Sequence, residues 1–110
     1  MQILEGLEAP YYAVIFSARA SADQTDYETT IGRMLELVAD MPGFLGVESA
    51  HDESGEVVVS YWRDEDAILG WKRHVEHRAA QQRGRAQWYD AYAVRVARVE
   101  RSYTFFAASG

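Results

Sequence analysis

Apolar residues gather in short segments whose composition and alternation predict β-strands. The first segment, "YYAVIFSAR" at 11–19, is β-branched and aromatic. Two more, "FLGVESAH" at 44–51 and "EVVVSYWR" at 56–63, flank the loop "DESG". Because Gly55 in that loop can take the left-handed backbone conformation of a tight turn, the two segments predict a β-hairpin.

Between the first strand and the hairpin, the apolar positions change to helical spacing. They recur on one face as Tyr27, Ile31, Met34, Leu35 and Val38. Thr25 is placed to cap the start of this helix, and Glu28 three residues later completes a capping box. The segment "MPGF" (41–44) has the proline and glycine of a tight turn, so we expect the helix to end there.

A second helix is predicted after the hairpin. Asp64 is a suitable N-cap, and the acidic residues that follow it are favoured by the helix dipole. Gly84 is expected to end or bend this helix, and "AYAVRVARVERSYTF" (91–105) then predicts a long last strand. The alternation in that strand slips between Val96 and Val99, which indicates a β-bulge. The predicted buried stripe of the helix consists of Ile68, Trp71, Val75 and Ala79.

The element order is β-α-β-β-α-β, which predicts one ferredoxin-like α+β domain over residues 1–110, with a mobile tail at about 105–110. In this fold two helices cover one face of a four-stranded antiparallel sheet. Both faces of the predicted strands are apolar, whereas a sheet with one solvated face would carry polar residues there. We therefore expect a homodimer that buries the open face of the sheet, with the last strand reaching across to the partner.

The composition narrows the possible partners and compartments. The 110 residues carry a formal net charge of −6, with their 11 basic residues scattered among acids, which argues against nucleic acid or an anionic membrane as partner. Without cysteine, the chain has no disulfide, thiolate metal site or thiol nucleophile. The N-terminus lacks a signal-peptide pattern, and the longest apolar run (11–16) is too short to cross a bilayer, so we expect a cytoplasmic protein.

The chain has no glycine-rich phosphate loop, dinucleotide fingerprint, nucleophile elbow or zinc-protease motif. The phrases "PGFLGVES" and "VVVSYWRDEDAILGWKRHVEHRAAQQRGRAQWY", with the late valine-arginine strand, resemble the antibiotic biosynthesis monooxygenase (ABM) superfamily over nearly the whole chain. The most specific part runs from Trp71 through His77 to Gly84 and Arg85. The resemblance implies a dimeric α+β-barrel built from two ferredoxin-like halves.

The resemblance also implies a choice of activities. Some members are cofactor-free oxygenases that convert anthrone-like phenols to quinones, some bind and degrade haem, and many have no established substrate. The haem degraders use an asparagine on the first strand and a later helix histidine, and the histidine position is Gln81 here. The quinone formers use an asparagine one turn before the tryptophan, a position that is Ala67 here. Since this chain has no asparagine at all, it departs from both types, and we expect it to carry neither haem nor flavin.

His74 and His77 lie three residues apart in the second predicted helix. If that helix is continuous, His74 flanks the buried stripe and His77 points nearly opposite to it. The pair could be polar residues on a solvated or interface surface, metal ligands, or a catalytic base that titrates near neutral pH. Metal binding is disfavoured because Glu76, the nearest carboxylate, lies on another face. The resemblance favours His77 as the base, since a helix break near Arg73 is common in the family and would turn His77 inward.

The other candidate binding residues are aromatic or basic. Trp71 belongs to the predicted buried stripe, and it could also form a flat wall for an aromatic ligand. Tyr61 and Trp62 point to opposite faces of the sheet, so one should face the helices and the other the partner. Arg85 is a candidate contact for the ligand, although an arginine more often forms a surface salt bridge.

Two functions remain open from the sequence. The first is a cofactor-independent ABM-type monooxygenase that acts on a small aromatic or quinone-like molecule, with His77 or His74 as the base. A deprotonated substrate of this kind passes an electron to O₂ directly, so the protein needs only a dry pocket, a proton acceptor and dipoles that hold the anion. The second is a non-catalytic small-ligand-binding or stress-related module. In either case the predicted ligand contacts are Trp71, Tyr61, Trp62 and Arg85.

Overall fold

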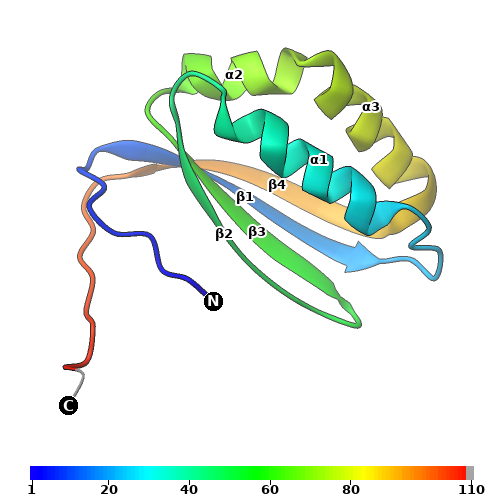
Figure 1. Cartoon of the computed structure of the whole chain (residues 1–110), viewed down its shortest axis with the longest axis horizontal. Coiled ribbons are helices and arrows are strands. Elements are labelled where there is room, and N and C mark those ends of the chain that lie inside the picture. The colour runs from blue at the N-terminus through cyan, green and yellow to red at the C-terminus, as the bar shows by residue number, and fades with distance from the viewer. Residues whose placement is uncertain (109–110) are drawn as a thin grey trace.

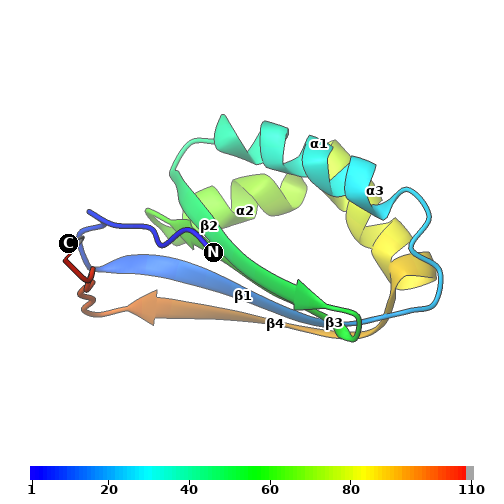
Figure 2. The ribbon, with the colours of Figure 1, turned by 60° about the horizontal axis from the view of Figure 1, so that its bottom comes forward.

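A computed structural model describes residues 1–108 of the chain, apart from the side chain of Val75. The helices α1 (Tyr27–Ala39), α2 (Glu65–Arg73) and α3 (Val75–Arg83) all lie on one face of a single sheet, as Figure 1 and Figure 2 show. The predicted ferredoxin-like α+β fold is confirmed. The four antiparallel strands lie side by side in the order β2-β3-β1-β4, with bounds β1 (Tyr11–Ala20), β2 (Phe44–Asp52), β3 (Gly55–Trp62) and β4 (Tyr89–Val99).

The last strand is shorter and more regular than predicted. β4 ends at Val99 because its only neighbour, β1, begins at Tyr11 directly opposite, and residues 100–108 then have no strand to pair with. The predicted bulge between Val96 and Val99 is wrong, since this part of β4 pairs with β1 without interruption. The register shifts instead between Arg19 and Ala20, at the far end of the pair.

The start of α1 also differs from the prediction. Thr25 does not cap the helix; the N-cap is Asp26, which has a left-handed backbone (φ 63°) and makes no side-chain cap. Contacts with a distant segment hold this turn in place. The Trp88 indole donates to the Thr25 carbonyl at 2.9 Å, and the Gln24 amide donates to the Trp88 carbonyl at 2.8 Å. These long-range hydrogen bonds override the local capping signal.

The second predicted helix is confirmed at its N-cap but is divided in two. The Asp64 carboxylate accepts from the Ala67 amide at 2.8 Å, as expected. At His74 the backbone becomes extended (ψ 129°), which ends α2 and starts α3 in a new direction. Ala79 is therefore exposed, contrary to the predicted stripe, and the prediction for Val75 lies outside the described residues. None of the helices in residues 1–108 is long and apolar enough to span a membrane.

Two tryptophans anchor the helices to the sheet. Trp62 and Trp88 are each only 1% exposed. Trp62 packs against Phe44 with ring centroids 5.2 Å apart, and Val38 and Ala67 complete this core cluster. Trp88 ends η1 (Gly84–Trp88), a π-helical turn that follows α3 directly; α3 ends at Arg83, and Gly84 itself keeps a right-handed helical backbone (φ −56°, ψ −48°). The core is small because the helices and the sheet separate between these two anchors.

The N-terminal segment covers part of the other, open face of the sheet. The Leu4 amide donates to Glu48 at 3.0 Å, and the Tyr61 hydroxyl donates to the same carboxylate at 2.6 Å. Leu4 fills the space over Gly46, where a Cβ would lie 2.6 Å from the leucine Cδ1. Nearer the β2–β3 hairpin, Val57 on this face is 46% exposed. Both terminal segments leave the sheet at the same end (Figure 1).

Gly55 and Gly32 make a matched pair for a stability test. Gly55 has a positive φ of 159°, which L side chains rarely adopt although it is not the left-handed turn conformation expected, and it lies against β1: a Cβ there would lie 1.9 Å from the Ala18 carbonyl oxygen. Gly55→Ala should lower the free energy of unfolding by about 1–3 kcal/mol. Gly32→Ala, in α1 with no atom within 4 Å of the new Cβ, should raise it by about 0.5–1 kcal/mol. Urea denaturation measures both, and equal effects would contradict this account.

Candidate functional site

A cavity of about 810 Å³ lies between the helices and the sheet. Such a volume suits a drug-sized ligand. The face of α1 that the sequence predicted to be buried forms part of its roof, together with Ile68 and Trp71 of α2 and His77, Ala80 and Gln81 of α3. Its floor is the helix-facing side of the strands: Val14, Phe16, Val47, Val58, Ser60, Trp62, Val94 and Val96.

The cavity opens to solvent along β4. This strand is an edge of the sheet, and Val94 and Val96 point to the helix side, in register with Phe16 and Val14. They are nevertheless 50% and 51% exposed, because the helices do not extend over this edge. A ligand can therefore enter along the apolar side of β4.

His77 lies in the roof of the cavity, stacked on Trp71. The two ring centroids are 4.4 Å apart and the planes differ by 21°. The break at His74 turns His77 inward, as the family resemblance predicted. Its Nδ1 lies 3.1 Å from the Trp71 carbonyl oxygen. Since a carbonyl only accepts hydrogen bonds, Nδ1 carries the proton and Nε2 of the neutral ring keeps a lone pair.

The environment of His77 favours this neutral ring. Burial lowers its pKa below the usual 6.5, the hydrogen bond to the Trp71 carbonyl opposes this, and the charge of His74 lowers the pKa further. An imidazole that is neutral at pH 7 and has a free Nε2 is able to accept a proton from a bound molecule.

His74 has a different position from His77. Its ring accepts a hydrogen bond from the Glu76 amide at 3.2 Å and so caps the start of α3. The ring lies 5.4 Å from Trp71, but it is not among the residues that line the cavity. His74 therefore positions α3, and His77 is the histidine that faces the cavity.

The structure divides the predicted ligand contacts between two faces of the sheet. Trp71 and Trp62 line the cavity, and Trp62 faces the helices. Tyr61 lies on the open face with Glu48 and does not line this cavity, because the alternation of β3 turns neighbouring side chains to opposite sides. Arg85 lies at the rim, where its Nη1 donates to the Tyr92 hydroxyl at 3.2 Å.

The cavity also contains a carboxylate that was not predicted from the sequence, Glu56. The Tyr27 hydroxyl donates to one of its oxygens, and the Tyr89 hydroxyl donates to the other at 2.9 Å. Burial raises the pKa of both tyrosines, and their contact with Glu56 adds to this, so both remain protonated donors. Alternation within β3 could have identified Glu56, since it shares the helix-facing side with Ser60 and Trp62.

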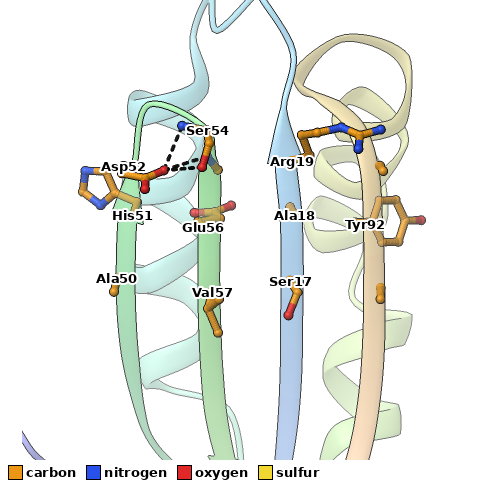
Figure 3. A pocket seen from close by; sticks show the side chains of 13 residues that line it. Ser17, Ala18, Arg19, Ala50, His51, Asp52, Ser54, Glu56, Val57 and Tyr92 are labelled. Atoms are coloured by element: carbon orange, nitrogen blue, oxygen red, sulfur yellow. Dashed lines mark hydrogen bonds between the residues drawn. The ribbon is translucent and has the colours of Figure 1, made fainter.

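A second hollow, of about 740 Å³, lies on the open face over the β2–β3 hairpin. Figure 3 shows that His51 points away over the outer edge of β2. Asp52 is committed to the turn, since it accepts from the Ser54 amide at 2.8 Å, the Ser54 hydroxyl and the Gly55 amide. This hollow is wide open, and Asp52 and Ser54 in it are engaged in the hairpin turn, so the cavity under the helices is the better candidate.

Comparison with known proteins identifies the family. Residues 10–83 match the family model described as antibiotic biosynthesis monooxygenase. The chain belongs to this family. The uncharacterized protein YqjZ of Bacillus subtilis (strain 168) is 54% identical over 99 residues, which cover 89% of this chain and 87% of YqjZ. Jasmonate monooxygenase ABM of Pyricularia oryzae is 32% identical over 95 residues, which cover 83% of this chain and 44% of that protein.

Solved structures of other proteins share the fold. A variant of SnoaB, a cofactor-independent oxygenase from Streptomyces nogalater, superposes with a TM-score of 0.73 at 14% identity, covering 86% of this chain and 97% of SnoaB. PA3566 from Pseudomonas aeruginosa gives a TM-score of 0.67 at 15% identity, covering 89% and 100%. At these identities the likeness concerns the fold alone.

The free energy of unfolding should fall as the pH is lowered from about 7.5 to about 5. The pKa of His77 is lower in the folded chain than the usual 6.5, so the unfolded chain takes up the proton first as the pH falls. Protonation therefore stabilises the unfolded chain relative to the folded one below that pH. Urea denaturation across this range should show a smaller pH dependence for His77→Gln than for the wild type. His51→Gln, which alters an exposed ring, should keep the wild-type dependence. Identical profiles for all three proteins would rule out the buried neutral imidazole.

Proposed function

We propose that this chain is a cofactor-independent monooxygenase of the antibiotic biosynthesis monooxygenase type, acting on a small aromatic or quinone-like molecule. The observation that carries the proposal is the stacked pair of Trp71 and His77 in the roof of an apolar cavity. The indole offers a flat surface to an aromatic ring, and the adjacent imidazole accepts a phenolic or enolic proton at Nε2.

The rest of the cavity supports the same chemistry. Ser60 accepts from the Trp62 indole at 2.9 Å, so its hydroxyl proton is free to donate to the substrate anion. The apolar floor lowers the local dielectric constant and strengthens such contacts. Once deprotonated, the substrate reduces O₂ itself; converting a ring methylene to a carbonyl consumes one O₂ and releases one water. The protein then supplies proton transfer, orientation and shielding.

The named relatives support an oxygenase. One relative by sequence is called a monooxygenase, and SnoaB, with the same fold, is described as a cofactor-independent oxygenase. The alternative is a non-catalytic small-ligand-binding or stress-related module, which the absence of asparagine favours. Oxygen uptake with anthrone or dihydroxyaromatic substrates separates the two, since a binding module would consume none.

Replacing His77 by alanine should lower turnover by at least about a hundredfold, because a positioned base contributes that much or more. His74→Ala should lower turnover much less, although losing the cap of α3 should cost about 1 kcal/mol of stability. Oxygen consumption measures turnover, and thermal melting checks that His77→Ala is folded. Equal activity of the wild type and His77→Ala would assign the proton transfer to another group.

We also propose that the chain forms a homodimer through the open face of the sheet. Val57 on this face is 46% exposed, and Ala91, Ala93 and Ala97 of β4 present small side chains to the same face, with Arg95 between the last two. The segment beyond β4 carries three exposed aromatic residues that this chain does not cover: Tyr103, Phe105 and Phe106. Such surface is more often buried in an assembly than left in water.

Sedimentation at micromolar concentration should give the mass of a dimer. Val57→Lys should weaken the association, because it would bury a charge in the interface. Glu53→Lys, in the exposed hairpin turn, adds the same side chain outside the proposed interface and should leave the dimer intact. A monomeric wild type would exclude this assembly.

A further inference from the structure

Glu56 lies at the end of the cavity without a cation to neutralise it. Its carboxylate is half-buried, and none of the ion pairs within residues 1–108 involves it. Tyr27 of α1 and Tyr89 at the start of β4 hold it from two sides. A carboxylate in such a position is costly unless it is well supplied with hydrogen bonds.

The two tyrosines meet only part of this requirement. A carboxylate has about four lone-pair positions, and each oxygen of Glu56 accepts one hydroxyl here. Each tyrosine hydroxyl has a single proton and directs it at Glu56. The positions that remain on Glu56 are acceptors, so a bound molecule satisfies them only by donating.

Aromatic rings surround this end of the cavity. Phe16 lies 5.3 Å from Tyr89 and 5.5 Å from Tyr92 between ring centroids, and Tyr27 lies 5.5 Å from Trp88. Aromatic faces attract an apolar ring, and they also attract a cation placed over them. A carboxylate surrounded by aromatic rings is therefore suited to bind a flat molecule that carries a neutral or cationic hydrogen-bond donor.

We propose that the Glu56 end of the cavity binds the donor group, a hydroxyl or an ammonium, of an aromatic ligand, and that it rejects aromatic carboxylates. Glu56 accepts the hydrogen bond while Tyr27 and Tyr89 fix its orientation. A ligand carboxylate would bring a like charge next to Glu56 and leave its acceptors unsatisfied. This inference deepens the proposed function. It depends on that function only in taking the bound ligand to be the substrate of the monooxygenase.

Arg85 favours the opposite selectivity. It lies at the rim and donates to the Tyr92 hydroxyl, so it could attract an anion to the same side of the cavity. Arg85 is exposed, however, and its charge is screened by water and salt, whereas Glu56 is half-buried. We therefore expect Glu56 to decide which ligands bind.

Four probes with the same ring system test this inference: 2-naphthol, 2-naphthylmethylammonium, 2-methoxynaphthalene and 2-naphthoate. Titration calorimetry with the wild-type protein near pH 7 should give dissociation constants for the two donors at least about tenfold lower than for the ether and the carboxylate. Binding of 2-naphthoate as tight as that of 2-naphthol would overturn the proposal without any variant.

Glu56→Gln keeps the shape of the side chain and removes its charge. The preference for 2-naphthol over 2-naphthoate should then fall below about threefold, since the amide neither repels an anion nor lacks a donor for it. Glu48→Gln is the matched control, because Glu48 also accepts a tyrosine hydroxyl but lies on the open face. It should keep the wild-type preference, and melting curves check that both variants are folded. Equal preferences in Glu56→Gln and the wild type would overturn the role of Glu56.

The outcome separates this inference from the proposed monooxygenase. Probe selectivity that depends on Glu56, without oxygen uptake by any donor-bearing substrate, would support the binding site and contradict the enzyme. Oxygen uptake that depends on His77, with no selectivity among the probes, would support the enzyme and contradict this binding site.

Discussion

At His74 the backbone leaves the helical conformation for one residue, with φ −62° and ψ 129°, and the directions of the side chains in α3 follow from that turn. The break is stabilised on both sides. The His74 amide donates to the Trp71 carbonyl at 3.0 Å, and its ring accepts from the Glu76 amide. Arg33 of α1 then holds Glu76 with two nitrogens, at 3.2 and 3.3 Å. A continuous helix would turn His77 away from the cavity.

The cavity exists because the helices contact the sheet mainly at two places. Trp62 fills one and Trp88 the other, and each indole N–H has an acceptor, the Ser60 hydroxyl and the Thr25 carbonyl. Both anchors are therefore buried without an unsatisfied polar atom. Between them the apolar face of α1 meets open space, so residues that would stabilise the fold as a core are available to a ligand.

Different interactions stabilise the two polar ends of the cavity, His77 and Glu56. His77 is kept neutral by burial, and Glu56 is not among the groups that shift its pKa. Glu56 is held in place by hydrogen bonds from the Tyr27 and Tyr89 hydroxyls, and the pKa of each tyrosine is raised by burial and by its contact with Glu56. Because the ends act separately, one can serve proton transfer while the other serves recognition.

Much of the fold could be predicted from the sequence because hydrophobic periodicity is a local property. It identified the strands, the hairpin, the Asp64 cap and the face of α1 that lines the cavity. The phrase from Trp71 to Arg85 also indicated the family and the inward turn of His77. Local pattern predicts the ends of helices and strands less well. β4 ends where β1 begins, and at the start of α1 the predicted Thr25 cap is replaced by contacts with Trp88.

Only the tertiary structure decided which side chains meet. Tyr27, Glu56 and Tyr89 come from three elements, and the sheet register and the turn before α1 bring their hydroxyls to one carboxylate. Periodicity shows that Glu56 faces the helices, but no spacing along the chain specifies what it finds there. The sequence by itself therefore determined the layers, because hydrophobic periodicity is local, and it indicated His77 only through the resemblance to the family. The tertiary structure decided the second polar end of the cavity, because that end depends on contacts between residues far apart in the chain.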